Sequence, residues 1–126
     1  MDQANRFERG LAIRKQVLGE TYVEQSLQKA TEYTRPMQEL TTEYCWGTIW
    51  DRPGLPRQTR SLINVAMLTA LNRPNELKLH IRGALRNGCS REEIVEVLLQ
   101  TAIYCGVPAA MDAFKVMQQV FDEADE

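Results

Sequence analysis

The stretch Pro74–Leu85, PNELKLHIRGAL, has the periodicity of an amphipathic helix and guides the interpretation of the rest of the chain. Proline suits the first turn of a helix, and apolar side chains recur at helical spacing at Leu77, Ile81 and Ala84. Similar patterns continue on both sides of this stretch, whereas the alternation typical of strands is nearly absent. The sequence therefore predicts an all-α protein of six or seven short helices.

Capping and breaking residues divide the chain into these helices. A helix from about residue 4 to residue 18 ends at Gly19, and TYVE at 21–24 has the pattern of a capping box that opens the next. RPGLP at 52–56 must be a turn, because two prolines and a glycine cannot continue a helix. SREE at 90–93 is a second capping box, and GVP at 106–108 interrupts the helix that it opens. With no linker or repeat, we expect a single domain over residues 1–126.

Composition limits the classes of partner. The 126 residues are 44% hydrophobic, and their net charge of -2 argues against nucleic acid as a partner. No apolar stretch approaches the roughly 20 residues needed to cross a bilayer. The polar N-terminus lacks the apolar region of a signal peptide, so we expect a cytoplasmic protein with no membrane partner. Three cysteines without a Cys-x-x-Cys pair, and a single histidine, predict no metal site and reduced thiols.

Acid–base groups come together at Glu76 and His80. These residues are four apart, so on a helix they share one face, which Gly83 and Asn87 continue. A carboxylate beside an imidazole orients the ring and raises its pKa, which makes the pair a candidate for catalysis. A single histidine is more often a packing residue, but His80 lies at the edge of the apolar stripe, where pockets form between helices.

Four further residues are candidates for a binding site. Arg52 and Arg60 each suit a carboxylate held by a bidentate fork, the alternative being a surface arginine. Trp46 lies four residues before a second tryptophan, which is typical of core or interface aromatics. Gly47 beside it leaves room for a ligand or another backbone to approach. Tyr104 stands at the helix break, where exposed backbone groups often line sites.

Several motifs together resemble a known family. They are Trp46-Gly47 through Trp50, Arg52-Pro53-Gly54-Leu55, Arg60, Glu76-Leu77 with His80, Asn87-Gly88, Glu92-Glu93-Ile94-x-Glu96 and Tyr104-x-Gly106-x-Pro108-Ala109. In order and spacing, over residues from about 7 to 121, this series resembles the γ-carboxymuconolactone decarboxylase family of the alkylhydroperoxidase D-like superfamily. The resemblance implies an alkylhydroperoxidase D-like all-α fold and a homo-oligomer, most simply a hexamer built as a trimer of dimers.

The resemblance also distinguishes between two chemistries. The peroxidase branch of the superfamily carries Cys-x-x-Cys-x-x-x-His, whose positions fall here at Arg73, Glu76 and His80. Because both thiols are missing, dithiol peroxidase chemistry is disfavoured and decarboxylation is implied. The residues that the resemblance implies are His80 and Glu76 for catalysis, with Arg52, Arg60, Trp46 and Tyr104 for substrate binding.

The implied reaction converts 4-carboxymuconolactone to 3-oxoadipate enol-lactone and carbon dioxide, in protocatechuate catabolism. Loss of carbon dioxide pushes electrons through the double bond onto the lactone carbonyl, so the substrate is its own electron sink and no cofactor is expected. Two alternatives stay open. One is a non-catalytic or repurposed all-α oligomer that binds a small carboxylic acid. The other is a different cofactor-free lyase or isomerase acting on a related lactone.

Overall fold

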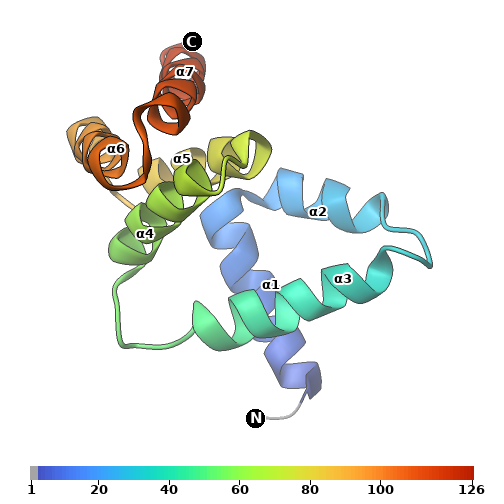
Figure 1. Ribbon diagram of the computed structural model, residues 1–126. Coiled ribbons are helices and arrows are strands. Elements are labelled where there is room, and N and C mark those ends of the chain that lie inside the picture. The colour runs from blue at the N-terminus through green and yellow to red at the C-terminus, as the bar shows by residue number, and fades with distance from the viewer. Residues whose placement is uncertain (1–2) are drawn as a thin grey trace. The chain divides into compact units, whose positions relative to one another are not determined.

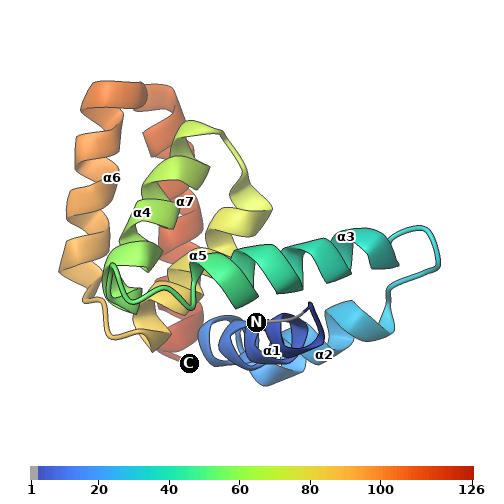
Figure 2. The same ribbon diagram turned by 90° about the horizontal axis from the view of Figure 1, so that it is seen from below.

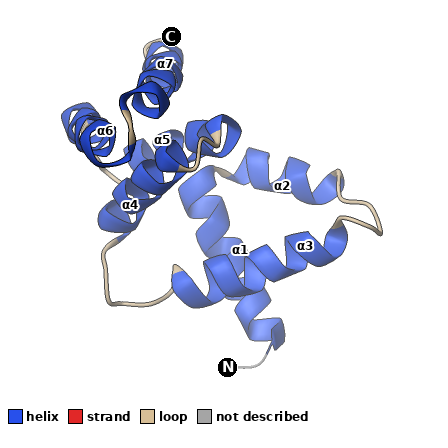
Figure 3. Cartoon of the chain, in the orientation of Figure 1, coloured by secondary structure: helices blue, strands red, loops and turns tan. Residues whose placement is uncertain are grey.

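The computed structural model describes residues 3–126, and every regular element within this range is helical (Figures 1 and 3). In chain order the elements are α1 (Gln3–Leu18), α2 (Glu20–Gln28), α3 (Arg35–Leu40), the π-helix η1 (Thr41–Ile49), α4 (Arg57–Ala70), α5 (Pro74–Arg86), α6 (Arg91–Cys105) and α7 (Val107–Ala124). The all-α prediction is confirmed.

The chain divides into two compact units, Met1–Leu55 and Pro56–Glu126. The first holds α1 to η1, and the second holds α4 to α7. The single domain expected over residues 1–126 stays a prediction.

In the N-terminal unit α3 runs directly into η1, and η1 packs across α1 (Figure 2). Two glycines make the close crossing possible. A Cβ on Gly10 would collide with the carbonyl oxygen of Thr42, and a Cβ on Gly47 would collide with that of Arg6. The close approach predicted at Gly47 is therefore confirmed, and the approaching group is the backbone of α1.

Polar and aromatic side chains also join these helices. The buried Arg14 of α1 donates from Nη1 to Gln38 Oε1 at 2.9 Å and to Thr42 Oγ1 at 3.3 Å. Trp46 of η1 and Trp50, the residue just after η1, are buried and stack with ring centroids 4.8 Å apart. A π-helix has more residues per turn than an α-helix, so side chains four apart project in nearly the same direction. Trp46 is thus a packing aromatic, whatever else it does.

The turn between α1 and α2 differs from the sequence prediction. Gly19 has a φ of 97°, which glycine adopts without strain, and α2 starts directly after it at Glu20 without a side-chain cap. The capping box predicted at residues 21–24 is wrong, because a one-residue turn already places Thr21 inside the helix.

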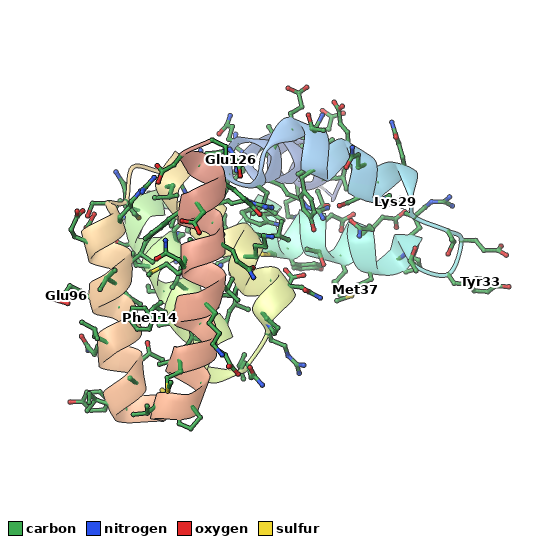
Figure 4. The ribbon with its side chains drawn as sticks, turned by 90° about the horizontal axis from the view of Figure 1, so that it is seen from above. Lys29, Tyr33, Met37, Glu96, Phe114 and Glu126 are labelled. Carbon is green, nitrogen blue, oxygen red and sulfur yellow. The ribbon has the colours of Figure 1, made fainter. Side chains whose placement is uncertain are left out.

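At the other end of α2, Tyr33 projects outward from the loop to α3 and is 86% exposed (Figure 4).

The C-terminal unit is a four-helix arrangement in which α4 packs on α5 and α6, and α7 packs on the same two helices (Figure 2). Its core takes one stripe from each helix. The buried core residues are Val65, Leu77, Ile81, Ala84, Cys89, Ile94, Leu98, Ala113, Met117, Val120 and Phe121. The stripe predicted for Leu77, Ile81 and Ala84 is confirmed.

Local signals set the ends of these helices. Ser90 and Glu93 form the predicted capping box: Ser90 Oγ accepts from the Glu93 backbone N–H at 3.0 Å, and Glu93 Oε1 accepts from that of Ser90 at 2.8 Å. Gly106, with a φ of 119°, joins α6 to α7 as a single non-helical residue.

Within residues 3–126 no helix combines the length and apolarity that crossing a membrane requires. A cytoplasmic location stays a prediction.

Candidate active site

His80 lies on α5, where this helix packs against α4, and only 8% of it is exposed. Its Nδ1 atom is 3.3 Å from Nδ2 of Asn64 on α4. An amide nitrogen only donates, so Nδ1 accepts this hydrogen bond. In the neutral ring the proton is then carried by Nε2.

Burial lowers the pKa of His80 from its ordinary value of 6.5 to about 4. His80 is therefore a neutral imidazole near pH 7. The expectation that a neighbouring carboxylate raises this pKa is wrong, since Glu76 lies exposed in the first turn of α5 whereas His80 is buried against α4.

The contact between Asn64 and His80 belongs to a row of polar contacts, here called the polar seam, along the pairing of α4 with α5. Residue numbers rise along α4 as they fall along α5, so the two helices run antiparallel. The contacts are Asn64 Nδ2 to His80 Nδ1 at 3.3 Å, Asn87 Nδ2 to Ser61 Oγ at 2.8 Å, and Cys89 Sγ to the Gln58 carbonyl oxygen at 3.4 Å. This register holds Asn64 opposite His80.

Arg60 and Glu76 flank His80 along this seam. Arg60 is half-buried and lies one turn before Asn64, so both occupy the same side of α4. Glu76 lies one turn before His80 on α5. Because the helices are antiparallel, the positions of Arg60 and Glu76 lie in opposite directions along the seam from the contact between Asn64 and His80. The order of groups is cation, neutral imidazole, anion, which suits a substrate that carries a negative charge at the Arg60 end.

Tyr104 lies on another surface of the same unit. It is 82% exposed on α6, in an apolar groove of about 370 Å³ between α4 and α6. The groove is lined by Thr59, Leu62, Ile63, Ala66, Val97, Gln100, Thr101, Tyr104 and Cys105. Neither His80 nor Arg60 is among these residues, so within this unit the structure does not bring Tyr104 together with His80.

Two predicted binding residues belong to the N-terminal unit. Trp46 is 2% exposed in its stack, and Arg52 is exposed in the turn after η1. Their roles in binding stay predictions. In the part of the chain that the structure describes, no three His, Cys, Asp or Glu side chains gather as a metal-binding group.

Asn64 is the site residue that sequence reasoning missed. The available signal was a single amide inside the apolar run of α4, one turn after Arg60. That signal is weak, because an amide on a helix is usually a solvated residue. Only the packing of α4 on α5 identifies its partner.

Comparisons with known proteins identify the family of the chain. Residues 35–119 match the model of the carboxymuconolactone decarboxylase family. The chain is 46% identical over 117 residues to nitrosuccinic acid decarboxylase npaB of Metarhizium robertsii, covering 93% of this chain and 82% of that protein. It is 38% identical over 123 residues to 4-carboxymuconolactone decarboxylase of Acinetobacter baylyi, covering 98% and 92%. Both relatives are named as decarboxylases, which supports a carboxy-lyase activity.

Proposed function

Because the chain belongs to the carboxymuconolactone decarboxylase family, as its motifs predicted, we propose that it decarboxylates a small dicarboxylate without a cofactor. The proposed substrate is 4-carboxymuconolactone, and the products are 3-oxoadipate enol-lactone and carbon dioxide, in protocatechuate catabolism. The 38% identity to a 4-carboxymuconolactone decarboxylase over 98% of the chain supports this choice.

Nitrosuccinate is a second candidate substrate, favoured by the 46% identity to a nitrosuccinic acid decarboxylase. The two acids share a chemical plan. In each, one carbon carries both the departing carboxylate and an acetate arm, and that carbon is joined to an electron-accepting group. When the carbon–carboxylate bond breaks, its electron pair moves onto a nitro oxygen or, through the double bond, onto the lactone carbonyl oxygen. A proton then adds to carbon. One site can therefore serve either reaction.

The buried, neutral His80 is the observation that carries the proposal. In this mechanism its Nε2–H donates a hydrogen bond to the oxygen on which negative charge develops. A donor held in a poorly solvated site stabilises that charge far more than water does, because it needs no reorientation during the reaction. A neutral ring suits this role better than the protonated imidazole that the sequence suggested, since near pH 7 little imidazolium is present.

The flanking residues take the remaining roles in the proposed mechanism. Arg60 binds the acetate arm by a bidentate fork. Glu76, at the exposed end of the seam, relays a proton from solvent to the carbanion. Arg52, Trp46 and Tyr104 are proposed as further substrate-binding residues, and their assignment rests on the family resemblance.

The test is a carbon dioxide release assay with both acids, on the parent and on His80→Ala, with circular dichroism to check folding. We expect turnover of at least one acid by the dialysed, chelator-treated protein. His80→Ala should lose about 10²- to 10³-fold in kcat, the usual cost of removing one oxyanion donor. Activity of the variant within about threefold of the parent would contradict the role of His80. Thermal stabilisation by both acids without turnover would favour the acid-binding alternative.

We further propose a homo-oligomer, a hexamer built as a trimer of dimers. The number of subunits rests on the family resemblance. The support for assembly is the exposed apolar surface of the last two helices, which includes Leu99, Ile103, Val107 and Met111. Light scattering should give a mass about six times the 14.4 kDa of the chain. Ile103→Asp should lower that mass, whereas the exposed control Lys115→Glu should not. A parent mass of 14.4 kDa would refute the proposal.

A further inference from the structure

We infer that Asn64 is a positioning residue that holds His80 in its Nε2–H tautomer and so determines which ring nitrogen carries the proton. The catalytic consequence rests on the proposed function. The tautomer itself does not, and it is measurable without any substrate.

The packing of α4 on α5 fixes the geometry of this contact. Asn64 Nδ2 lies 3.3 Å from His80 Nδ1, with Asn64 half-buried and His80 buried. Just after the end of α5, Asn87 donates to Ser61, whose side chain is fully buried on α4. The buried core residues Val65, Leu77 and Ile81 also join the two helices, so their register does not depend on this one contact.

Amide orientation and ring tautomer are linked at this contact. A ring that carried its proton on Nδ1 would set two N–H donors against each other, unless the amide turned to present Oδ1. The amide nitrogen of Asn64 therefore excludes the Nδ1–H tautomer as long as it faces the ring. If the amide donor of Asn64 is removed or replaced by an acceptor, the Nδ1–H tautomer of His80 is no longer excluded.

The choice of tautomer matters for the proposed chemistry. With the proton on Nε2, His80 offers a donor to the developing oxyanion. With the proton on Nδ1, the Nε2 lone pair would face that negative charge and oppose its formation. Asn64 thus acts on the transition state more than on substrate binding, and its loss should lower kcat with little change in KM.

The first test is nitrogen NMR of the ring. His80 is the only histidine in the chain, so its ring signals need no assignment. The spectra are recorded near pH 8.5, where a histidine beside a carboxylate is also neutral. We expect the parent to show the Nε2–H tautomer and Asn64→Asp, which is similar in size but accepts only, to show Nδ1–H. The matched control Asn87→Ala removes a seam hydrogen bond away from the ring and should keep Nε2–H.

Kinetics at the same pH provide the second readout. Asn64→Asp should lose about 10²-fold in kcat, comparable to the loss of one oxyanion donor, with KM within about threefold of the parent. A parent ring protonated on Nδ1, or an Asn64→Asp ring still protonated on Nε2, overturns the inference whatever the activity. If Asn64→Asp does not fold, Asn64→Ala replaces it. A mixture of tautomers then supports the inference, and unchanged Nε2–H refutes it. Absence of turnover with both acids would refute the proposed function while the NMR result still decides the role of Asn64.

Discussion

Acidification from pH 7 to pH 5 should destabilise the protein through His80. Its pKa is about 4 in the folded chain, against the ordinary 6.5 that applies to the unfolded chain. Between these two values the unfolded state binds a proton that the folded state does not, so the free energy of unfolding falls as the pH falls. Above pH 6.5 this contribution is fully present, and below pH 4 it is fully lost.

The size of the effect follows from the two pKa values. Their difference of about 2.5 corresponds to about 3 kcal/mol in all, at about 1.4 kcal/mol for each tenfold change. About 2 kcal/mol of this is lost by pH 5. The exposed carboxylates of Glu123 and Asp125 have pKa values lowered by their hydrogen bonds to Arg82 and Arg91, so they titrate at lower pH. With no second histidine, the window from pH 7 to pH 5 reports mainly on His80.

The assay is urea denaturation at pH 7, 6 and 5, at one protein concentration, on the parent and on His80→Gln. The variant lowers stability at neutral pH, but the quantity compared is the change with pH. The parent should lose about 2 kcal/mol from pH 7 to pH 5, and the variant less than about 0.5 kcal/mol. Equal losses in the two proteins would refute the reasoning, because the buried neutral ring would then contribute nothing to the pH dependence.

Three further predictions concern other parts of the chain. Gly47→Ala should lower the free energy of unfolding, measured by urea denaturation, by more than about 2 kcal/mol, because its Cβ would collide with backbone atoms. The control Gly54→Ala, which has open space around it, should change that free energy by less than about 0.5 kcal/mol. Equal losses in the two variants would contradict the close crossing. Arg60→Lys should raise KM at least about tenfold, because lysine cannot form the bidentate fork. The exposed Arg52→Lys is measured in the same steady-state assay. A larger rise in KM for Arg52→Lys would assign binding of the acetate arm to Arg52. Glu76→Gln should lower kcat less than His80→Ala does and leave the pKa of the histidine near 4, which proton NMR titration measures; a clear fall in that pKa would mean that the carboxylate supports the ring after all.

Local sequence signals determined the helices. The signals that begin and end these helices act through neighbours within one turn, so the sequence alone predicts their effects. Examples are Pro74, the capping box at Ser90 and Gly106. The periodicity of Leu77, Ile81 and Ala84 likewise predicted the buried side of α5. The false capping box at residues 21–24 shows the limit of such signals, because the one-residue turn at Gly19 had already started the helix.

The chemical state of the candidate site was decided only by tertiary structure. From the sequence, the neighbour of His80 was Glu76, four residues away, and a raised pKa followed. In the fold Asn64, sixteen residues away, contacts the ring, and burial lowers that pKa instead. Helix periodicity is a local property that the order of residues carries by itself. Burial, and the partner that meets a buried nitrogen, depend on which helices pack together and in what register.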